Sequence, residues 1–357
     1  MSTALYALID KLARLRLLTQ NEFAELISGF TPELSEYLFA KARIIREKYY
    51  GKKVYIRGLI EFTNYCKNDC YYCGIRKSNL KVERYRLTFD QIMECCAIGY
   101  ELGFRTFVLQ GGEDAHFTEV RMLEIIRAIK GQYPDCALTL SIGEKPYATY
   151  LKFFEAGADR YLLRHETACD AHYAQLHPGD LSAATRKQAL RDLKRIGFQT
   201  GTGFMVGSPL QTPDLLAQDL LFIHDLQPEM VGIGPFIPHH DTPFANEKAG
   251  TLELTLFMLG LLRLMLPQAL LPATTALGTI DKDGRERGVL AGANVVMPNL
   301  SPLDVRQKYL LYDNKIAIGT EAAEGLNSLC ELMAGIGYQI VFERGDFAGQ
   351  GAAPPVP

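Results

Sequence analysis

Hydrophobic and polar positions along this chain follow two different periods. Over the first 50 residues apolar side chains recur at intervals of three and four, as at Leu8, Leu12 and Leu15, which predicts amphipathic helices. Beyond residue 50, short apolar runs alternate with segments of helical period. The runs predict strands at Ile56–Phe62, Thr106–Gln110, Ala137–Ser141, Arg160–Arg164, Thr202–Val206, Met230–Gly234, Pro272–Ala276 and Asn294–Met297.

Eight repeats of strand and helix favour an α/β fold of the (β/α)8 TIM-barrel type over a doubly wound sheet. We expect an N-terminal helical extension over residues 1–50, the barrel over 51–312, a C-terminal helical segment over 313–345 and a disordered Gly/Ala/Pro-rich tail over 346–357. In such a barrel, functional groups lie at the carboxyl ends of the strands. Polar and glycine-rich runs follow nearly every predicted strand, as this fold requires.

Composition narrows the class of protein. The 357 residues are 48% hydrophobic and 22% charged, with a net charge of −3, so no basic field argues for nucleic acid. No apolar stretch is long enough to cross a membrane, and the amphipathic start does not resemble a secretory signal. Eight cysteines are too few for a disulfide scaffold. We therefore expect a cytoplasmic protein that works without oxygen.

Three of these cysteines carry the strongest chemical signal. Cys66, Cys70 and Cys73 follow the first predicted strand at the spacing C-x3-C-x2-C. They can hold three irons of a [4Fe–4S] cubane and leave the fourth without a protein ligand. S-adenosylmethionine, bound through its amino and carboxylate groups, is the most economical ligand for that iron. A zinc site would need a fourth ligand, and zinc or no metal remain the alternatives.

Polar groups at later strand ends could complete a cofactor site. The turn Gly111–Glu113 lets backbone groups approach a ligand closely, although an ordinary turn is the alternative. Ser141 ends the next strand. Tyr72 could lie against adenine or pack the loop.

Charged residues around the fourth predicted strand are further candidates. Arg160 and Arg164 share one face of it, where they need an anionic ligand or an acidic partner. Glu166 could accept hydrogen bonds from ribose hydroxyls. Arg186 suits a ligand carboxylate, and a solvated arginine is the alternative.

Other residues give weaker signals. Thr274 and Thr275 cannot both face inward if the strand is regular there. His239 and His240 could ligate iron, but a polar loop is the better interpretation. The remaining cysteines show no metal spacing and are expected to be buried thiols: Cys95, Cys96, Cys136, Cys169 and Cys330.

The cysteine motif, joined to QGGE, RYLLRHETA, GIGPFIPH-x-DTP, ATTALGT and AGANVVMPN, resembles the radical S-adenosylmethionine (radical SAM) family. Within that family it is most similar to the [FeFe]-hydrogenase maturases. The resemblance implies a [4Fe–4S] cluster and S-adenosylmethionine in the barrel mouth, reductive cleavage to a 5′-deoxyadenosyl radical, and a small iron complex of cysteine, CO and cyanide as substrate. It implies a ferredoxin- or flavodoxin-type reductant and other hydrogenase maturases as partners.

The resemblance also assigns residues. Cofactor contacts are expected from Tyr72, Gly111, Gly112, Glu113, Ser141, Glu166 and Arg186. Substrate contacts are expected from Thr139, Arg160, Arg164, Met230, Thr274, Thr275, Met297 and Tyr309, although the two methionines would more often be core.

One departure from the family pattern matters. Some maturases carry extra C-terminal cysteines for an accessory cluster, whereas this stretch holds only Cys330, so we expect one cluster per chain. Two other functions stay open. One is a mutase or synthase on a small organic substrate, like methylornithine synthase or biotin synthase, and the other is a non-catalytic cluster carrier.

Overall fold

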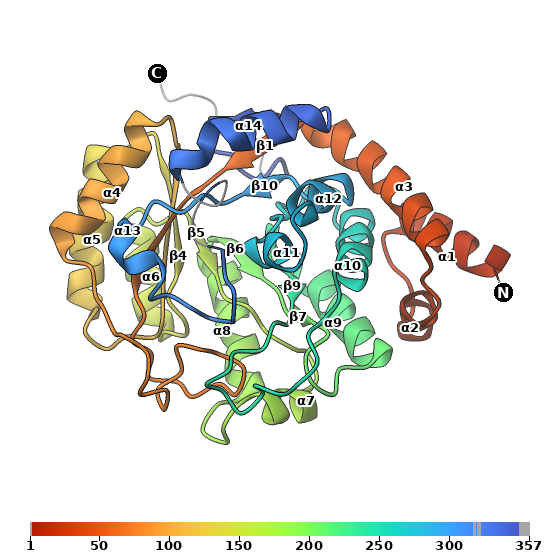
Figure 1. Cartoon of the computed structure of the whole chain (residues 1–357), viewed down its shortest axis with the longest axis horizontal. Coiled ribbons are helices and arrows are strands. Elements are labelled where there is room, and N and C mark those ends of the chain that lie inside the picture. The colour runs from red at the N-terminus through yellow and green to blue at the C-terminus, as the bar shows by residue number, and fades with distance from the viewer. Residues whose placement is uncertain (1, 317–318, 320–322, 350–357) are drawn as a thin grey trace.

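The computed structural model describes residues 2–316, 319 and 323–349. Its N-terminal part is helical, as predicted: α1 (Ser2–Leu15), α2 (Gln20–Ser28) and α3 (Pro32–Tyr50). Thr19 and Glu22 form a capping box at the start of α2, and Thr31 caps α3 ahead of Pro32. These helices pack on α10 (Leu252–Met265), on the outer side of the molecule (Figure 1). Because α10 is covered on both sides, almost all its residues are buried.

The strands form parallel sheets. They are β1 (Lys53–Ile56), β2 (Gly58–Thr63), β3 (Thr106–Gly111), β4 (Ala137–Ser141), β5 (Arg160–Leu162), β6 (Gln199–Thr202), β7 (Met205–Val206), β8 (Met230–Val231), β9 (Gly234–Pro235), β10 (Val295–Val296) and β11 (Gln339–Val341). The order β2-β3-β4-β5-β6-β8 makes one sheet, β10-β1-β11 a second, and β7-β9 a third. Parallel strands need crossover helices, and helices follow most of the strands.

Most of the remaining helices surround the strands, whereas α11 is drawn near the centre of the view (Figure 1). They are α4 (Phe89–Glu101), α5 (Glu119–Gln132), α6 (Tyr147–Glu155), α7 (Asp170–Leu176), α8 (Ala183–Ile196), α9 (Pro213–Leu226), α11 (Thr275–Ile280), α12 (Gly284–Leu290), α13 (Leu303–Arg306) and α14 (Leu326–Gly335). Thr212 caps α9, and its side chain accepts a hydrogen bond from Leu215 N. The apolar core lies where these helices meet the strands.

Most predicted strands are shorter or interrupted in the structure, and three differences are larger. The run Thr202–Val206 is split, and its strand begins three residues earlier, at Gln199. Pro272–Ala276 forms no strand, because Thr274 is already the N-cap of α11. At the C-terminus, expected to be helical, β11 follows α14 and pairs with β1.

The predicted disordered tail is wrong for its first residues. Asp346 forms an ion pair with Arg160 at 2.7 Å. Phe347 N donates to Gln199 Oε1 at 3.4 Å. Residues 344–348 therefore form a segment, here called the C-terminal strap, that packs on the amino ends of β3, β5 and β6. Residues 350–357 lie outside the described part of the chain.

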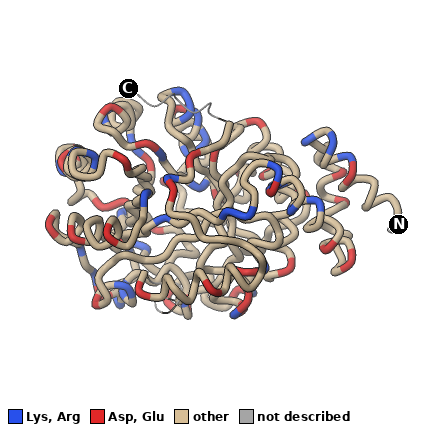
Figure 2. Tube along the Cα trace, turned by 90° about the horizontal axis from the view of Figure 1, so that it is seen from above, with Lys and Arg blue, Asp and Glu red and all other residues tan. Residues whose placement is uncertain are grey.

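Charge is mixed along the chain. Figure 2 shows acidic and basic residues interspersed, in keeping with the net charge of −3. Among the described residues, no helix combines the length and the apolar character that crossing a membrane requires.

Candidate functional site

Three free cysteines lie in the irregular loop between β2 and α4, here called the cysteine loop. Cys66, Cys70 and Cys73 are all partly exposed at their surface, and none forms a disulfide. Burial, followed by the charge of neighbouring thiolates, raises the pKa of the Cys70 thiol to about 12 and that of Cys73 well above the usual range. A bound metal cluster is what stabilises thiolates in such surroundings, so the donor set fits one.

The spacing of the sulfur atoms argues against a single metal ion. A tetrahedral zinc site brings its sulfur ligands to about 3.8 Å from one another, given Zn–S bonds of about 2.3 Å. Within the described part of the chain, the three cysteines do not form a group whose ligand atoms all lie within 4.8 Å. Cubane ligands sit on separate irons and are wider apart. The geometry therefore favours a cluster over zinc.

Arg84 organises the cysteine loop, a role that the sequence pattern did not reveal. Its guanidinium donates to four carbonyl groups, those of Asn64, Ile75, Arg76 and Asn79. These carbonyls come from both sides of the three cysteines. The backbone carbonyls of a loop have no neighbouring strand or helical turn to donate hydrogen bonds to them. Here the guanidinium of Arg84 donates those hydrogen bonds.

The glycine turn after β3 packs against the same loop. A side-chain carbon on Gly112 would lie 2.1 Å from Tyr65 O, so only glycine allows this approach. Glu113 N points at Cys66 Sγ, 3.4 Å away, and Lys67 N donates to Glu113 O at 2.9 Å. The turn thus contributes a backbone donor toward the first cysteine.

Glu166 lies in a strained conformation at the exit of β5. Its φ is 65°, a region that non-glycine residues seldom occupy and that clusters at functional sites. Its buried Oε2 accepts no hydrogen bond, although Arg164 Nη2 lies 3.2 Å away. Arg186 is already paired: it donates to Glu144 and to Arg164 O. Glu144 is a partner that the sequence analysis did not assign.

Deeper among the strands, Arg57 is the most informative residue that sequence reasoning missed. It is 5% exposed, and its Nε and Nη2 have no partner, while Nη1 lies 3.0 Å from Met230 Sδ. Burial lowers the pKa of this guanidinium well below its ordinary value, and the charge of Arg160 lowers it further. A buried cation without a carboxylate is costly, so this position favours an anionic or strongly polar ligand. In the sequence, the only indication of this buried position is that Arg57 is a charged residue within an apolar run.

Other buried polar atoms without a partner lie on neighbouring strands. Thr139 Oγ1 on β4 has none, and neither does Nε of Arg164 after β5, whose Nη2 is paired with Glu166. Thr139 and Arg160 are partners in the register of β4 and β5. Buried polar atoms are normally satisfied by protein, water or ligand. These atoms therefore mark a place for a polar ligand among the strands.

Arg160 belongs to the C-terminal strap instead. It is fully buried, pairs with Asp346, and donates to Thr106 Oγ1, Gln199 Oε1 and the carbonyls of Arg344 and Gly345. Every nitrogen of the guanidinium is used, at the amino ends of the strands. The expected substrate contact is not supported. The acidic partner that the sequence analysis left open is Asp346.

The other predicted site residues are placed as follows. Tyr309 is buried beside Lys315, which donates to its carbonyl at 3.1 Å. Thr274 is the N-cap residue of α11 without a side-chain capping hydrogen bond, and Thr275 begins the helix. Met297 packs with Met230. Ser141 pairs in register with Gln110, and the Tyr72 hydroxyl lies 3.1 Å from His177 Nε2. No observation yet assigns any of them a ligand.

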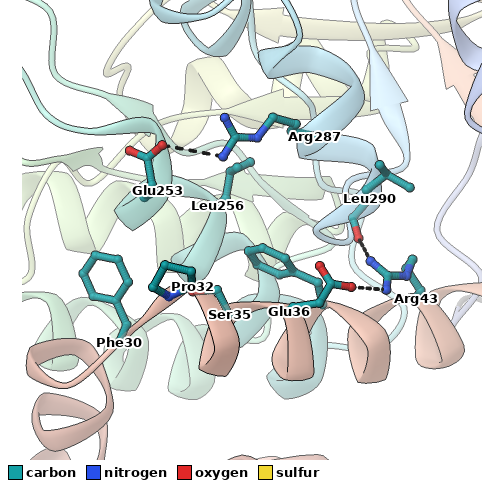
Figure 3. A pocket seen from close by; sticks show the side chains of 10 residues that line it. Phe30, Pro32, Ser35, Glu36, Arg43, Glu253, Leu256, Arg287 and Leu290 are labelled. Carbon is teal, nitrogen blue, oxygen red and sulfur yellow. Dashed lines mark hydrogen bonds and ion pairs between the residues drawn. The ribbon is translucent and has the colours of Figure 1, made fainter.

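A cavity of about 440 Å³ lies elsewhere, between α3, α10 and α12 (Figure 3). Its charged residues are already paired, Arg43 with Glu36 at 2.6 Å and Arg287 with Glu253 at 3.5 Å. The rest of its lining is mainly apolar. It offers no unsatisfied charge and none of the predicted site residues.

Comparison with known proteins agrees with this site. The family model described as the radical SAM superfamily matches residues 60–223. The chain is 47% identical to the [FeFe] hydrogenase maturase subunit HydE of Thermotoga maritima over 311 residues, which is 87% of this chain and 88% of that protein. It is 32% identical to the 3-methylornithine synthase of Methanosarcina barkeri, covering 86% and 87% of the two chains.

A solved structure is also similar. The crystal structure of methylornithine synthase (PylB) superposes with a TM-score of 0.82 at 28% identity, covering 94% of this chain and 97% of that one. Both comparisons extend well beyond the cysteine loop and include the strands that carry the buried polar atoms. The chain therefore belongs to the radical SAM superfamily, as an enzyme of the HydE type.

Proposed function

We propose that this protein matures [FeFe]-hydrogenase by radical chemistry on a small iron complex that carries cysteine, CO and cyanide. The proposal rests on the likeness to a HydE maturase over most of the chain. The single observation that carries it within the structure is the Arg57 guanidinium, buried among the strands with two nitrogen atoms unpaired.

The cofactor site is proposed at the carboxyl ends of the strands. Cys66, Cys70 and Cys73 would hold a [4Fe–4S] cluster, and Glu113, Glu166 and Arg186 would bind S-adenosylmethionine. When bound, the reduced cluster would supply one electron, cleaving the cofactor into methionine and a 5′-deoxyadenosyl radical. Glu113 Oε2 and Glu166 Oε2 accept no hydrogen bond, although each lies near a cation, Lys67 at 3.1 Å and Arg164 at 3.2 Å. This supports the placement, because a carboxylate can accept from cofactor amino or hydroxyl groups. Arg186 would bind the methionyl carboxylate in place of Glu144, its present partner.

The substrate site is proposed deeper, around Arg57, Thr139 and Arg164. Two guanidinium groups and a hydroxyl suit the cyanide and cysteine carboxylate of an anionic iron complex. Within the described residues, Nε and Nη2 of Arg57, Nε of Arg164 and Oγ1 of Thr139 have no partner and are available to such a ligand. The chain's contribution is to bind and orient this anion.

We place the strands in a closed (β/α)8 barrel, which the bridges Met230–Leu270, Pro272–Val295 and Leu59–Asn299 support by linking the sheets. Eight free cysteines support a reducing, cytoplasmic and anaerobic setting. A ferredoxin- or flavodoxin-type reductant and other hydrogenase maturases are the proposed partners.

A second candidate is a radical SAM mutase on an organic substrate. The 32% identity to 3-methylornithine synthase and the match to its solved structure favour it. Substrate dependence separates the two. With the reconstituted enzyme, S-adenosylmethionine and dithionite, an Fe(II)–cysteine complex bearing CO and cyanide should be consumed and should stimulate 5′-deoxyadenosine release. A small diamino acid should not. Stimulation by the diamino acid alone would support the mutase.

A further inference from the structure

Beside the cysteine loop lies a cluster of side chains that the proposed reaction does not use. His239 and His240 follow β9, and Asp313 comes from the segment after Tyr309. One ring nitrogen of each histidine and one carboxylate oxygen of Asp313 all lie within 4.8 Å of one another. Within the part of the chain that the structure describes, this is the group found with the ligand types and closeness of a single-ion metal site.

The backbone holds these side chains together before any metal arrives. Asp313 N donates to Pro238 O at 3.1 Å, and His240 N donates to Asp313 Oδ2 at 3.0 Å. The other oxygen of Asp313 lies 2.6 Å from His240 Nδ1. The two imidazole rings stack with centroids 4.4 Å apart. Ligands of a tetrahedral ion with bonds near 2.05 Å would be about 3.4 Å apart, so only small shifts are needed.

An ordinary ion pair would explain His240 and Asp313 but not His239. That ring is 3% exposed, and its Nδ1 accepts a hydrogen bond from Asp241 N at 3.1 Å. The lone pair of this nitrogen is turned toward the Asp241 N–H, so a metal ion bound at Nδ1 would have to displace that hydrogen bond. The Asp241 carboxylate lies 3.1 Å from His240 Nε2 and is also paired with Lys81 at 2.6 Å. The set of two imidazoles and carboxylates with solvent access suits zinc or iron(II).

We propose that His239, His240 and Asp313 bind one divalent first-row transition-metal ion, separate from the cluster of the three cysteines. The ion would join the loop after β9 to the segment that carries Asp313. Both lie against the cysteine loop: Gly74 N donates to Leu311 O at 2.9 Å, and a side chain on Gly74 would collide with the His239 ring. The ion would therefore fix one wall beside Cys73 and keep open positions for water or a ligand.

Zinc is the probe that tests this site. The full-length protein, reconstituted anaerobically with its cluster, is titrated with zinc sulfate by calorimetry and then assayed for zinc and iron after desalting. We expect one zinc per chain with no loss of iron. His240→Ala and Asp313→Asn should each weaken binding by an order of magnitude or more, and Asp313→Asn keeps the size of the side chain in case the alanine variant is unstable.

His224→Ala is the matched control. His224 also lies beside a carboxylate, 3.4 Å from Asp225, but it has no third ligand among the described residues, so its loss should leave zinc binding unchanged. Three outcomes would overturn the proposal: no stoichiometric zinc, equal binding by wild type and both site variants, or zinc uptake only with loss of iron. None of them bears on the proposed maturase reaction, which is assayed without zinc.

Discussion

At the scale of single residues, the buried arginines Arg57 and Arg160 differ in how many of their nitrogen atoms have hydrogen-bond partners. Every nitrogen of Arg160 has a partner, Nη2 in the C-terminal strap and the other two on Gln199 and Thr106. Arg57 leaves two nitrogen atoms without a partner. Desolvation is costly for both. Only Arg160 recovers that cost within the folded chain, so Arg57 is the arginine that a ligand would stabilise.

Replacement of Arg57 separates these roles. Arg57→Met should raise the free energy of unfolding by about 1–3 kcal/mol, because an unpaired buried polar group is removed. It should also abolish turnover of the iron complex while leaving reductive cleavage of S-adenosylmethionine intact. Urea unfolding and 5′-deoxyadenosine assays measure the two effects. Arg160→Met is the matched control and should destabilise the fold instead. A destabilised Arg57→Met protein with normal turnover would refute the assignment.

At the scale of elements, the cysteine loop depends on Arg84. Four loop carbonyls accept hydrogen bonds from this one side chain. Arg84→Ala should therefore lower the iron retained per chain and cost about 1–3 kcal/mol of stability, the range for leaving buried acceptors unpaired. Iron analysis after anaerobic desalting tests this. Arg127→Ala on the exposed face of α5 is the control, and equal iron in the two variants would exclude the role.

Elements could be predicted where the pattern is local. Strand β4 occupies Ala137–Ser141, as predicted, because alternation and its flanking polar residues agree. Strand β6 begins at Gln199, earlier than predicted, because Gln199–Gly201 is not an apolar run although all of it is buried. Thr274, which was predicted to lie in a strand, is the N-cap residue of α11. Polar residues inside a strand are buried by tertiary packing, which the spacing of apolar residues along the sequence does not reveal.

At the scale of the whole molecule, the C-terminal strap connects the C-terminal part of the chain to the amino ends of strands that lie far away in the sequence. Arg160 and Asp346 are 186 positions apart, so no local pattern could predict their pairing. The cysteine loop, by contrast, was visible from spacing alone. The sequence therefore indicated the chemistry at the carboxyl ends of the strands, and missed how their amino ends are covered.

Asp346 makes the strap sensitive to pH. Burial raises the pKa of its carboxyl, but the hydrogen bond from Arg344 and the charge of Arg160 outweigh burial and hold the pKa well below its ordinary value. A depressed pKa stabilises the fold above the unfolded-state pKa, near 3.9, and this contribution is lost as the pH falls. Asp346→Asn should cost about 1–3 kcal/mol at neutral pH.

Urea unfolding of wild type and Asp346→Asn between pH 7 and pH 3 measures that difference. The gap between the two proteins should be constant from pH 7 to about pH 5 and shrink below about pH 4. A gap that stays constant over the whole range would mean that the Asp346 charge does not hold the strap.

The central claim, a cluster on three cysteines that cleaves S-adenosylmethionine, is tested most directly by release of 5′-deoxyadenosine from the anaerobically reconstituted protein with dithionite. Wild type and Cys330→Ala should each hold about four irons per chain and release 5′-deoxyadenosine, whereas Cys73→Ala should lose both properties. If Cys73→Ala retained the cluster and full cleavage activity, the account would be contradicted.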